Sequence, residues 1–340
     1  MTVMKKTKLS LGVDTSNYKT SVAVVAEGGE ILFSRQEFLE VKKGERGLRQ
    51  SEALFQHVNK LPGAIASALS DREIRENIGC IAVSDRPRPE AGSYMPVFNA
   101  GVSAAEILSA SLAVPIYRFS HQEGHVEAVK YYSEMKEETS FICFHFSGGT
   151  TEALAIDKER GFFRIVGGSK DISYGQVLDR IGVAMGFNFP CGKEMDELAV
   201  ACFSGGCEMK TGPYSGRRLF TPIKVKDGFV NLSGIETQGQ RLLESLKNHN
   251  KADEMQIKKD VARELLCCIA DSVEGMTMQL AEKYDIKKFI FAGGVSSSEY
   301  IRNHIEERLA GKVSFVFGEA GLSQDNAVGT ALLGGNEIWH

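Results

Sequence analysis

Two stretches of this chain repeat one local pattern, a short apolar run, a polar turn, a second apolar run, a second turn and a third apolar run. The first reads LSLGVD, TSNYKT, SVAVVA, Gly28-Gly29 and ILFS, and the second reads FICFHF, SGGTT, EALAI, DKERG and FFRIV. Short β-branched runs bounded by Gly, Asn and Ser are typical of strands. Chance is the alternative, because β-meanders are common. Each unit opens one half of the chain and the turns match, so we interpret them as a duplicated lobe.

The rest of the chain alternates strand and helix patterns, as expected of an α/β protein. Further strands are predicted at 80–84, 115–119 and 288–292, and helices at 102–113, 236–247 and 254–283. Ser51–Leu69 also has helical spacing, and Pro62 is expected to interrupt it. A length of 340 residues, 43% apolar and 25% charged, suits two α/β lobes.

The cellular setting predicted is the cytosol. The opening MTVMKKTKLSLGVDTS has no apolar core of a signal peptide, and no apolar run approaches the length of a membrane span. A net charge of −4 argues against a surface that binds nucleic acid everywhere, although a local basic patch needs only a few cations. No CxxC pair occurs, so we expect reduced, mostly buried thiols. The seven cysteines are Cys80, Cys143, Cys191, Cys202, Cys207, Cys267 and Cys268.

Three glycine- or hydroxyl-rich turns are candidates for binding a phosphate. Asp14–Asn17 and Ser147–Thr151 each join two strands, one in each half, and two such hairpins could grip one polyphosphate. Plain turn formation is the alternative for either. A third turn, at Gly293-Gly294, leads from a strand into a helix, where a phosphate or a base could bind. The chain contains neither G-x-G-x-x-G after a strand nor G-x-x-x-x-G-K-[ST], which excludes the Rossmann dehydrogenase and P-loop classes.

His121 and His125 have the spacing of metal ligands on one helix face, i and i+4, and the alternative is two unrelated polar residues of a helix, because such pairs also occur by chance. Ser120 and Glu123 form a capping-box pattern at the start of that helix. A zincin protease needs Glu directly after the first His, and Glu123 is two residues on, so a protease is disfavoured. Asp325 is the candidate third ligand, and its alternative is a residue that complements a helix dipole.

Two further carboxylates, Asp179 and Asp196, flank the polar PCGKE loop. They could hold ribose hydroxyls, and the alternative is that both are solvated carboxylates on helix surfaces.

Seven motifs, in order along nearly the whole chain, resemble the TsaD/glycoprotease (Gcp) family, which makes threonylcarbamoyladenosine in tRNA. DTSNYKTSVAVV resembles the E-T-S-C-D-E-T opening of this family, SHQEGHVEA its H-x-E-G/A-H metal motif, and FSGGTTEAL its S-G-G-H-T loop. GQVLDRIGVAMGFNFPCGKEMDELA resembles G-E-A-F-D-K…G-L-x-Y-P-G-G-P-x-I-D, and NLSGIET resembles F-S-G-L-K-T. FAGGVSSSEYIR and SQDNA resemble A-G-G-V-x-x-N-x-x-L-R and T-D-N-G/A.

The resemblance implies an actin-like (ASKHA) α/β fold with two ribonuclease H-like lobes. It implies a first lobe of residues 1–117 plus 324–340 and a second lobe, with a helical insertion, of residues 118–323. A divalent metal, iron or zinc, would be held by His121, His125 and Asp325. The implied partners are tRNA, TsaB/TsaE-like proteins or a second copy of the chain, with no membrane. The implied contacts of threonylcarbamoyl-AMP or an adenine nucleotide are Asp14, Ser16, Ser147, Gly148, Gly149, Thr150, Asp179, Gly192, Asp196, Gly293, Gly294 and Ser298.

The reaction implied is acyl transfer. The exocyclic amine of an adenine in the tRNA anticodon loop would attack the carbamoyl carbonyl of the adduct, which the metal holds or polarises, and expel AMP.

Departures from the motifs cluster around the first turn. Tyr18-Lys19 replace the D-E pair, Asn17 replaces Cys, and Asp14 replaces Glu. We expect Lys19 to clamp an anionic group of the ligand, and the alternative is that it points into water. Elsewhere Thr150, Ser298 and Cys191 replace His, Asn and Gly, and Asp85-Arg86-Pro87-Arg88-Pro89 replaces a G-P-G-L segment.

These departures fit a diverged bacterial paralogue as well as a housekeeping enzyme. The alternatives are therefore an actin-like kinase or carbamoyltransferase for a small molecule, and a nucleotide-binding regulator of a true family member.

Overall fold

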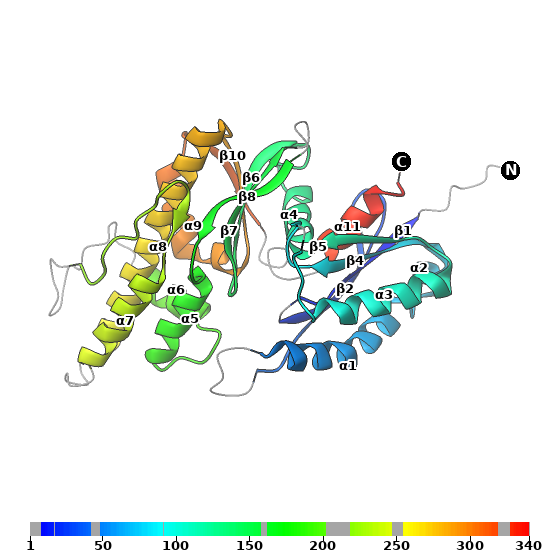
Figure 1. Ribbon diagram of the computed structural model, residues 1–340, viewed down its shortest axis with the longest axis horizontal. Helices are drawn as coiled ribbons and strands as arrows, with labels where there is room; N and C mark the ends of the chain where they lie inside the picture. Colours follow the sequence, from blue (N-terminus) through cyan, green and yellow to red (C-terminus); the bar gives the residue numbers. More distant parts are fainter. Residues whose placement is uncertain are drawn as a thin grey trace. The chain divides into compact units, whose positions relative to one another are not determined.

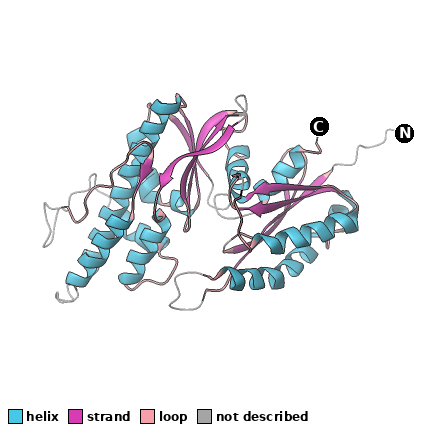
Figure 2. Cartoon of the chain, viewed as in Figure 1, coloured by secondary structure: helices cyan, strands magenta, loops and turns pink. Residues whose placement is uncertain are grey.

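The computed structural model describes residues 8–16, 18–41, 48–90, 92–157, 162–201, 218–246, 254–318 and 327–339. The chain divides into two compact units, Met1–Glu137 with Glu319–His340, and Glu138–Gly318 (Figure 1). In both units helices flank a β-sheet, as Figure 2 shows in cyan and magenta. No described helix is both long enough and apolar enough to pass through a lipid bilayer.

The first unit contains a five-stranded sheet in the order β3-β2-β1-β4-β5. The first three strands are antiparallel, and β4 and β5 continue the sheet in parallel with β1. At the end of β1, Asp14 lies opposite Ser21. The strands are β1 Leu9–Asp14, β2 Lys19–Val25, β3 Ile31–Phe38, β4 Ile78–Arg86 and β5 Ile116–Ser120.

Helices cover both faces of this sheet because the side chains of β2 alternate between the faces. Val22 and Val24 pack with α1 and α3, whereas Ala23 and Val25 pack with α11. The strand is therefore fully buried, which accounts for its continuous apolar run. The helices of this unit are α1 Gln50–Ala68, α2 Arg72–Asn77, α3 Phe98–Leu112, α4 His121–Tyr131 and α11 Val328–Asn336.

Helix α1 runs through Pro62 without a break, so the expected interruption there is wrong. Buried residues precede and follow the proline, among them His57, Leu61 and Ala64. Packing against the sheet on both sides of Pro62 stabilises the helix more than one lost backbone hydrogen bond costs.

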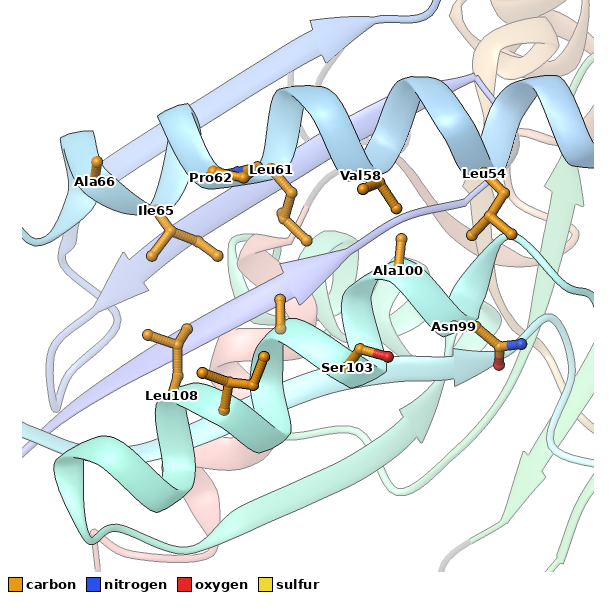
Figure 3. A pocket seen from close by; sticks show the side chains of 12 residues that line it. Leu54, Val58, Leu61, Pro62, Ile65, Ala66, Asn99, Ala100, Ser103 and Leu108 are labelled. Carbon is orange, nitrogen blue, oxygen red and sulfur yellow. The ribbon is translucent and has the colours of Figure 1, made fainter.

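An apolar groove of about 680 Å³ lies between α1 and α3 in the first unit. Leu54, Val58 and Ile65 of α1 face Ala100 and Leu108 of α3, as Figure 3 shows. No residue predicted to bind metal or nucleotide lines this groove.

The second unit repeats the strand order of the first. Strands β8-β7-β6-β10-β11 correspond to β3-β2-β1-β4-β5, with an antiparallel meander followed by two parallel strands. Short β9 is added beyond β8. The predicted duplication is confirmed. The strands are β6 Ser140–Phe146, β7 Thr151–Asp157, β8 Phe162–Ser169, β9 Phe229–Val230, β10 Lys288–Ala292 and β11 Ser314–Phe317.

The helices of the second unit enclose one large apolar core. Long helix α8 buries residues from Ile257 to Ala281, and its core also contains Phe144, Phe289 and Phe291 of the sheet. The helix predicted at 254–283 is thereby confirmed. The elements are α5 Tyr174–Ala184, α6 Gly192–Val200, α7 Ser233–Leu246, α8 Glu254–Tyr284, the 3-10 turn η2 Gly294–Ser297 and α9 Glu299–Leu309.

The boundary between the units falls later than the boundary between the predicted lobes. The predicted first lobe ended at residue 117, whereas the first compact unit extends to Glu137 and so includes α4. Strand β5 pairs with β4, and α4 follows it directly and packs against α11. These contacts are long-range, so the local pattern did not reveal them.

Helices α4 and α11 cross at a pair of glycines. A Cβ atom on Gly329 would lie 1.8 Å from the carbonyl oxygen of Gly124, and one on Gly124 would lie 2.8 Å from Thr330 Oγ1. Only residues without a side chain permit this approach. The crossing fixes α4 against the first sheet.

Gly329→Ala is expected to lower the free energy of unfolding by about 1–3 kcal/mol or more, since the added methyl group must separate two helix backbones. Thermal or urea unfolding measures this change. Gly63→Ala is the matched control, because a Cβ there meets nothing within 4 Å and alanine favours the helix. Equal stability of Gly329→Ala and wild type would contradict the close crossing.

Candidate functional site

Helix α4 begins with the predicted capping box. Ser120 Oγ accepts from the Glu123 amide at 3.2 Å, and Glu123 Oε2 accepts from the Ser120 amide at 2.6 Å. The box satisfies two amides of the first turn and fixes where the helix starts. His121 is thus the first helical residue, and His125 lies one turn further on the same face.

The two imidazoles point their Nε2 atoms at each other. His121 Nε2 and His125 Nε2 are 2.9 Å apart, and the rings meet edge to face with centroids separated by 4.3 Å. Two nitrogens that bind one tetrahedral zinc ion at about 2.0–2.1 Å are about 3.3–3.4 Å apart. The two Nε2 atoms, in hydrogen-bond contact at 2.9 Å, therefore lie within about half an ångström of the separation of two ligands of one divalent metal. Asp325, the predicted third ligand, lies outside the described residues.

Asp14 contacts His121, a contact that the sequence did not indicate. His121 Nδ1 and Asp14 Oδ2 are 2.7 Å apart, and the same oxygen accepts from Ser84 Oγ at 2.7 Å. The other oxygen accepts from the Ser16 amide at 2.8 Å. The carboxylate predicted to contact a nucleotide is thus held by internal donors.

Thr15 and Ser16 of the first turn are buried in the first unit. The Thr15 hydroxyl donates to the Val97 carbonyl at 3.0 Å and accepts from the Gly101 amide at 3.1 Å, which ties the turn to α3. The Ser16 side chain, predicted to bind a nucleotide, is only 3% exposed. Asn17 lies outside the described residues.

Lys19 is buried at the start of β2, with only 4% of the residue exposed. Its ammonium donates to Gln36 Oε1 at 3.0 Å and lies 4.5 Å from the centroid of the Phe38 ring, both on β3. Lys19 therefore does not point into water. Its role as an anion clamp stays a prediction.

In the second unit, Ser147–Thr150 forms a tight turn after β6. The Ser147 amide donates to the Thr150 carbonyl at 2.8 Å, and Ser147 Oγ accepts from the amides of Gly149 and Thr150 at 3.4 and 3.1 Å. A Cβ on Gly148 or Gly149 would meet nothing within 4 Å, so one side of the turn is open. Three amides of the turn are engaged within it, and the open side at Gly148 and Gly149 leaves room for an anion.

The start of α5 closes the other side of this turn. Ser173 caps α5, and its hydroxyl donates to the Gly148 carbonyl at 2.8 Å. A Cβ on Gly175 would lie 2.5 Å from Gly148 Cα, so the helix N-terminus is in contact with the turn. The positive end of the helix dipole adds to the attraction for an anion.

The glycine turn after β10 lies beside the Ser147–Thr150 turn. Gly293 has φ +93°, and a Cβ there would lie 2.3 Å from the Phe146 carbonyl oxygen, one residue before Ser147. Gly293 is therefore required by backbone geometry. A Cβ on Gly294 would meet nothing within 4 Å. The structure thus brings together the two glycine turns of the second unit.

The predicted ribose-binding carboxylates make internal hydrogen bonds. Asp179 Oδ1 accepts from the Cys191 amide at 2.7 Å, and burial raises the pKa of Asp179 while this bond opposes the shift. Asp196 accepts from Ser298 Oγ at 2.5 Å and from the amide of Glu299 at 2.8 Å. Asp196 thus ties α6 to the start of α9. A Cβ on Gly192, the first residue of α6, would meet nothing within 4 Å.

A second group of potential metal ligands lies between α8 and α9. One ligand atom each of Cys267, Asp271 and His304 lies within 4.8 Å of the others, and His304 Nε2 is 3.1 Å from Asp271 Oδ1. Cys267 is disulfide-bonded, so it offers no thiolate. The expectation of reduced thiols is wrong at this residue. It is confirmed for the described free cysteines Cys80, Cys143, Cys191 and Cys268, all buried. The sequence signal that could have indicated this group of potential metal ligands is the i, i+4 spacing of Cys267 and Asp271.

The motifs placed on these elements match a known family over most of the chain. Residues 33–332 match the family model TsaD, described as tRNA N6-adenosine threonylcarbamoyltransferase. The chain belongs to this family. The predicted TsaD membership and enzyme class are thereby confirmed.

Curated relatives bear the same description as the TsaD model. The tRNA N6-adenosine threonylcarbamoyltransferase of Neorickettsia sennetsu is 29% identical over 321 residues, which are 94% of this chain and 90% of that protein. The one from Pediococcus pentosaceus is 26% identical over 333 residues, 95% of this chain and 89% of that protein.

The solved structures compared below show the fold alone, because their identity to this chain is far below 25%. Full-length HypF in its phosphate- and nucleotide-bound form aligns with a TM-score of 0.59 at 12% identity, over 99% of this chain and 48% of HypF. Component A of Acidaminococcus fermentans (R)-2-hydroxyglutaryl-CoA dehydratase aligns with a TM-score of 0.55 at 14% identity, over 98% and 100%. Together with the duplicated sheet, these neighbours confirm the predicted actin-like fold.

Proposed function

We propose that this chain transfers a threonylcarbamoyl group from its AMP adduct to an adenine in the anticodon loop of tRNA. One observation carries the proposal. In a chain of the TsaD family, the Nε2 atoms of His121 and His125, one turn apart on α4, face each other at 2.9 Å, close to the separation of two ligands of one metal. Family membership supports the reaction, and the histidine geometry supports a metal of the iron or zinc kind.

The first unit would hold the metal through His121 and His125, with Asp325 as the third ligand. A bound divalent metal supplies Lewis-acid polarisation of the adduct's carbonyl. The chain's own contribution is to hold both imidazoles in one geometry, through the capping box and the Gly124–Gly329 crossing. Such prior positioning lowers the entropic cost of reaching the transition state.

The second unit would bind the adenylate part of the substrate. The open side of the Ser147–Thr150 turn and the N-terminus of α5 suit the phosphate of AMP. Charge develops on that phosphate as AMP leaves, so these donors stabilise the leaving group. Gly192, Gly294 and Ser298 are proposed to line the rest of the nucleotide site, and Asp179 and Asp196 to contact the ribose.

The proposed transfer forms one bond and breaks one bond. A bond forms between the adenine N6 atom and the carbamoyl carbon, and the bond from that carbon to the phosphate oxygen breaks. One of the two N6 protons passes to water, and AMP departs with the electron pair of the broken bond. We propose that Lys19 pairs with an anionic group of the ligand, and that the protein acts with TsaB/TsaE-like partners or as a homodimer in the cytoplasm.

Complementation tests this proposal in cells. In a bacterial strain depleted of its own synthase, the wild-type chain is expected to restore growth and threonylcarbamoyladenosine in tRNA, and His121→Ala is not. Gly63→Ala is the control for expression. Failure of a well-expressed wild-type chain would instead favour a regulator or a small-molecule enzyme. Nucleotide turnover without tRNA would then distinguish the enzyme from the regulator.

A further inference from the structure

The carboxylate of Asp14 is held from two strands at the base of the proposed metal site. Asp14 ends β1 and is only 1% exposed. Its Oδ1 accepts from the Ser16 amide at 2.8 Å, and its Oδ2 accepts from Ser84 Oγ of β4 at 2.7 Å. Ser84 Oγ is also 3.1 Å from Thr330 Oγ1 of α11. Rotation of this carboxylate would break bonds to both β4 and its own turn.

The third partner of Asp14 is His121. Asp14 Oδ2 is 2.7 Å from His121 Nδ1. The oxygens of a carboxylate only accept hydrogen bonds, so Nδ1 carries the proton in this contact. When the ring is neutral, its lone pair is then at Nε2, the atom that forms a hydrogen bond of 2.9 Å with His125 Nε2. This tautomer is the one that a metal requires at Nε2.

We propose that Asp14 is a positioning residue that fixes the tautomer and the ring orientation of His121 for a divalent metal. This role replaces the nucleotide contact predicted for Asp14 and rests on the metal assignment of the proposed function. Carboxylates that hold metal-binding histidines in this way raise metal affinity substantially. The bond also accounts for the burial of a charged side chain at the end of β1, since buried carboxylates need donors.

Metal titration of the full chain, with Zn²⁺ alone and a competing chromophoric chelator, tests the proposal. Asp14→Asn keeps the shape of the side chain but introduces a donor, and is expected to weaken Zn²⁺ binding about 10–100-fold. Asp14→Glu keeps the carboxylate, and Glu opens the corresponding motif of the family. It is expected to retain more affinity than Asp14→Asn.

The matched control is Asp71→Asn. Asp71 also lies in the first unit and accepts from two backbone amides at the start of α2. Asparagine caps a helix as well as aspartate does, so Zn²⁺ affinity should not change.

Nitrogen NMR of the metal-free protein reports the tautomer of His121, which should not change if Asp14 only stabilises the fold. Wild-type His121 is expected as the single Nδ1–H tautomer, and Asp14→Asn is expected to give a mixture. If Asp14→Asn fails to fold, Ser84→Ala replaces it, because it removes only one donor to Oδ2. Ser84→Ala is expected to lose less Zn²⁺ affinity than Asp14→Asn, and a fraction of its His121 is expected as the Nε2–H tautomer.

The inference is overturned if the foldable variant keeps both wild-type Zn²⁺ affinity and the single tautomer, or if the wild type binds no Zn²⁺. The proposed transfer reaction fails separately. A chain that shows the expected metal and tautomer changes but modifies no tRNA would support the role of Asp14 and refute the reaction.

Discussion

His125→Ala is expected to reduce the bound metal from about one ion per chain to none, because two ligands on one helix face cannot be replaced by one. The protein should remain folded, since alanine favours the interior of α4. Elemental analysis after purification without chelator measures the metal, and circular dichroism measures the fold. Loss of transfer activity should accompany loss of the metal.

His304→Ala is the matched control for this variant. His304 belongs to the group with Cys267 and Asp271 in the second unit, of which Asp271 and His304 are the two potential ligands. The metal content of His304→Ala should equal that of the wild type, because the disulfide bond of Cys267 leaves this group without a thiolate ligand. Loss of the metal in His304→Ala but not in His125→Ala would move the metal site to the second unit and contradict the assignment to α4.

Gly148→Val is expected to abolish the stabilisation of the protein by AMP or ATP. A Cβ at this position meets nothing within 4 Å, so we expect the variant to fold, and the valine side chain fills the open side of the turn where a phosphate would bind. At a ligand concentration 100 times Kd, the wild type should gain about 2.7 kcal/mol in the free energy of unfolding, and the variant should gain none. Thermal unfolding with and without nucleotide measures both values.

Gly63→Val is the control for a valine placed in open space. Gly63 lies in α1, and a Cβ there also meets nothing within 4 Å. This variant should keep the full stabilisation by nucleotide. Equal stabilisation of Gly148→Val and wild type would show that the phosphate does not bind at this turn.

The parts of the fold that the sequence predicted depend on short-range signals. The duplicated meander, the Ser120–Glu123 capping box and the His121–His125 pair each lie within a few neighbouring residues, where strand alternation and helix periodicity apply directly. The glycine turns were recognised for the same reason. Their proximity in the second unit follows from the parallel pairing of β6 with β10.

The parts that the sequence did not predict depend on contacts between distant residues. Asp14 and His121 are 107 positions apart, and Asp196 and Ser298 are 102 apart. No local pattern identifies such partners, so the sequence alone does not indicate the bond between Asp14 and His121. Pro62 failed as a helix breaker because packing outweighed propensity. The unit boundary differed because α4 packs with α11, which lies at the other end of the chain.

Transfer to tRNA in a purified system tests the central claim most directly. The full chain, with TsaB/TsaE-like partner proteins, is incubated with threonylcarbamoyl-AMP and a tRNA transcript, and the nucleosides of the digested tRNA are analysed by mass spectrometry. We expect threonylcarbamoyladenosine to form with the wild-type, metal-loaded chain and to be absent with His121→Ala. No modified adenosine from the wild type, under conditions where a bacterial relative produces it, would contradict the proposed function.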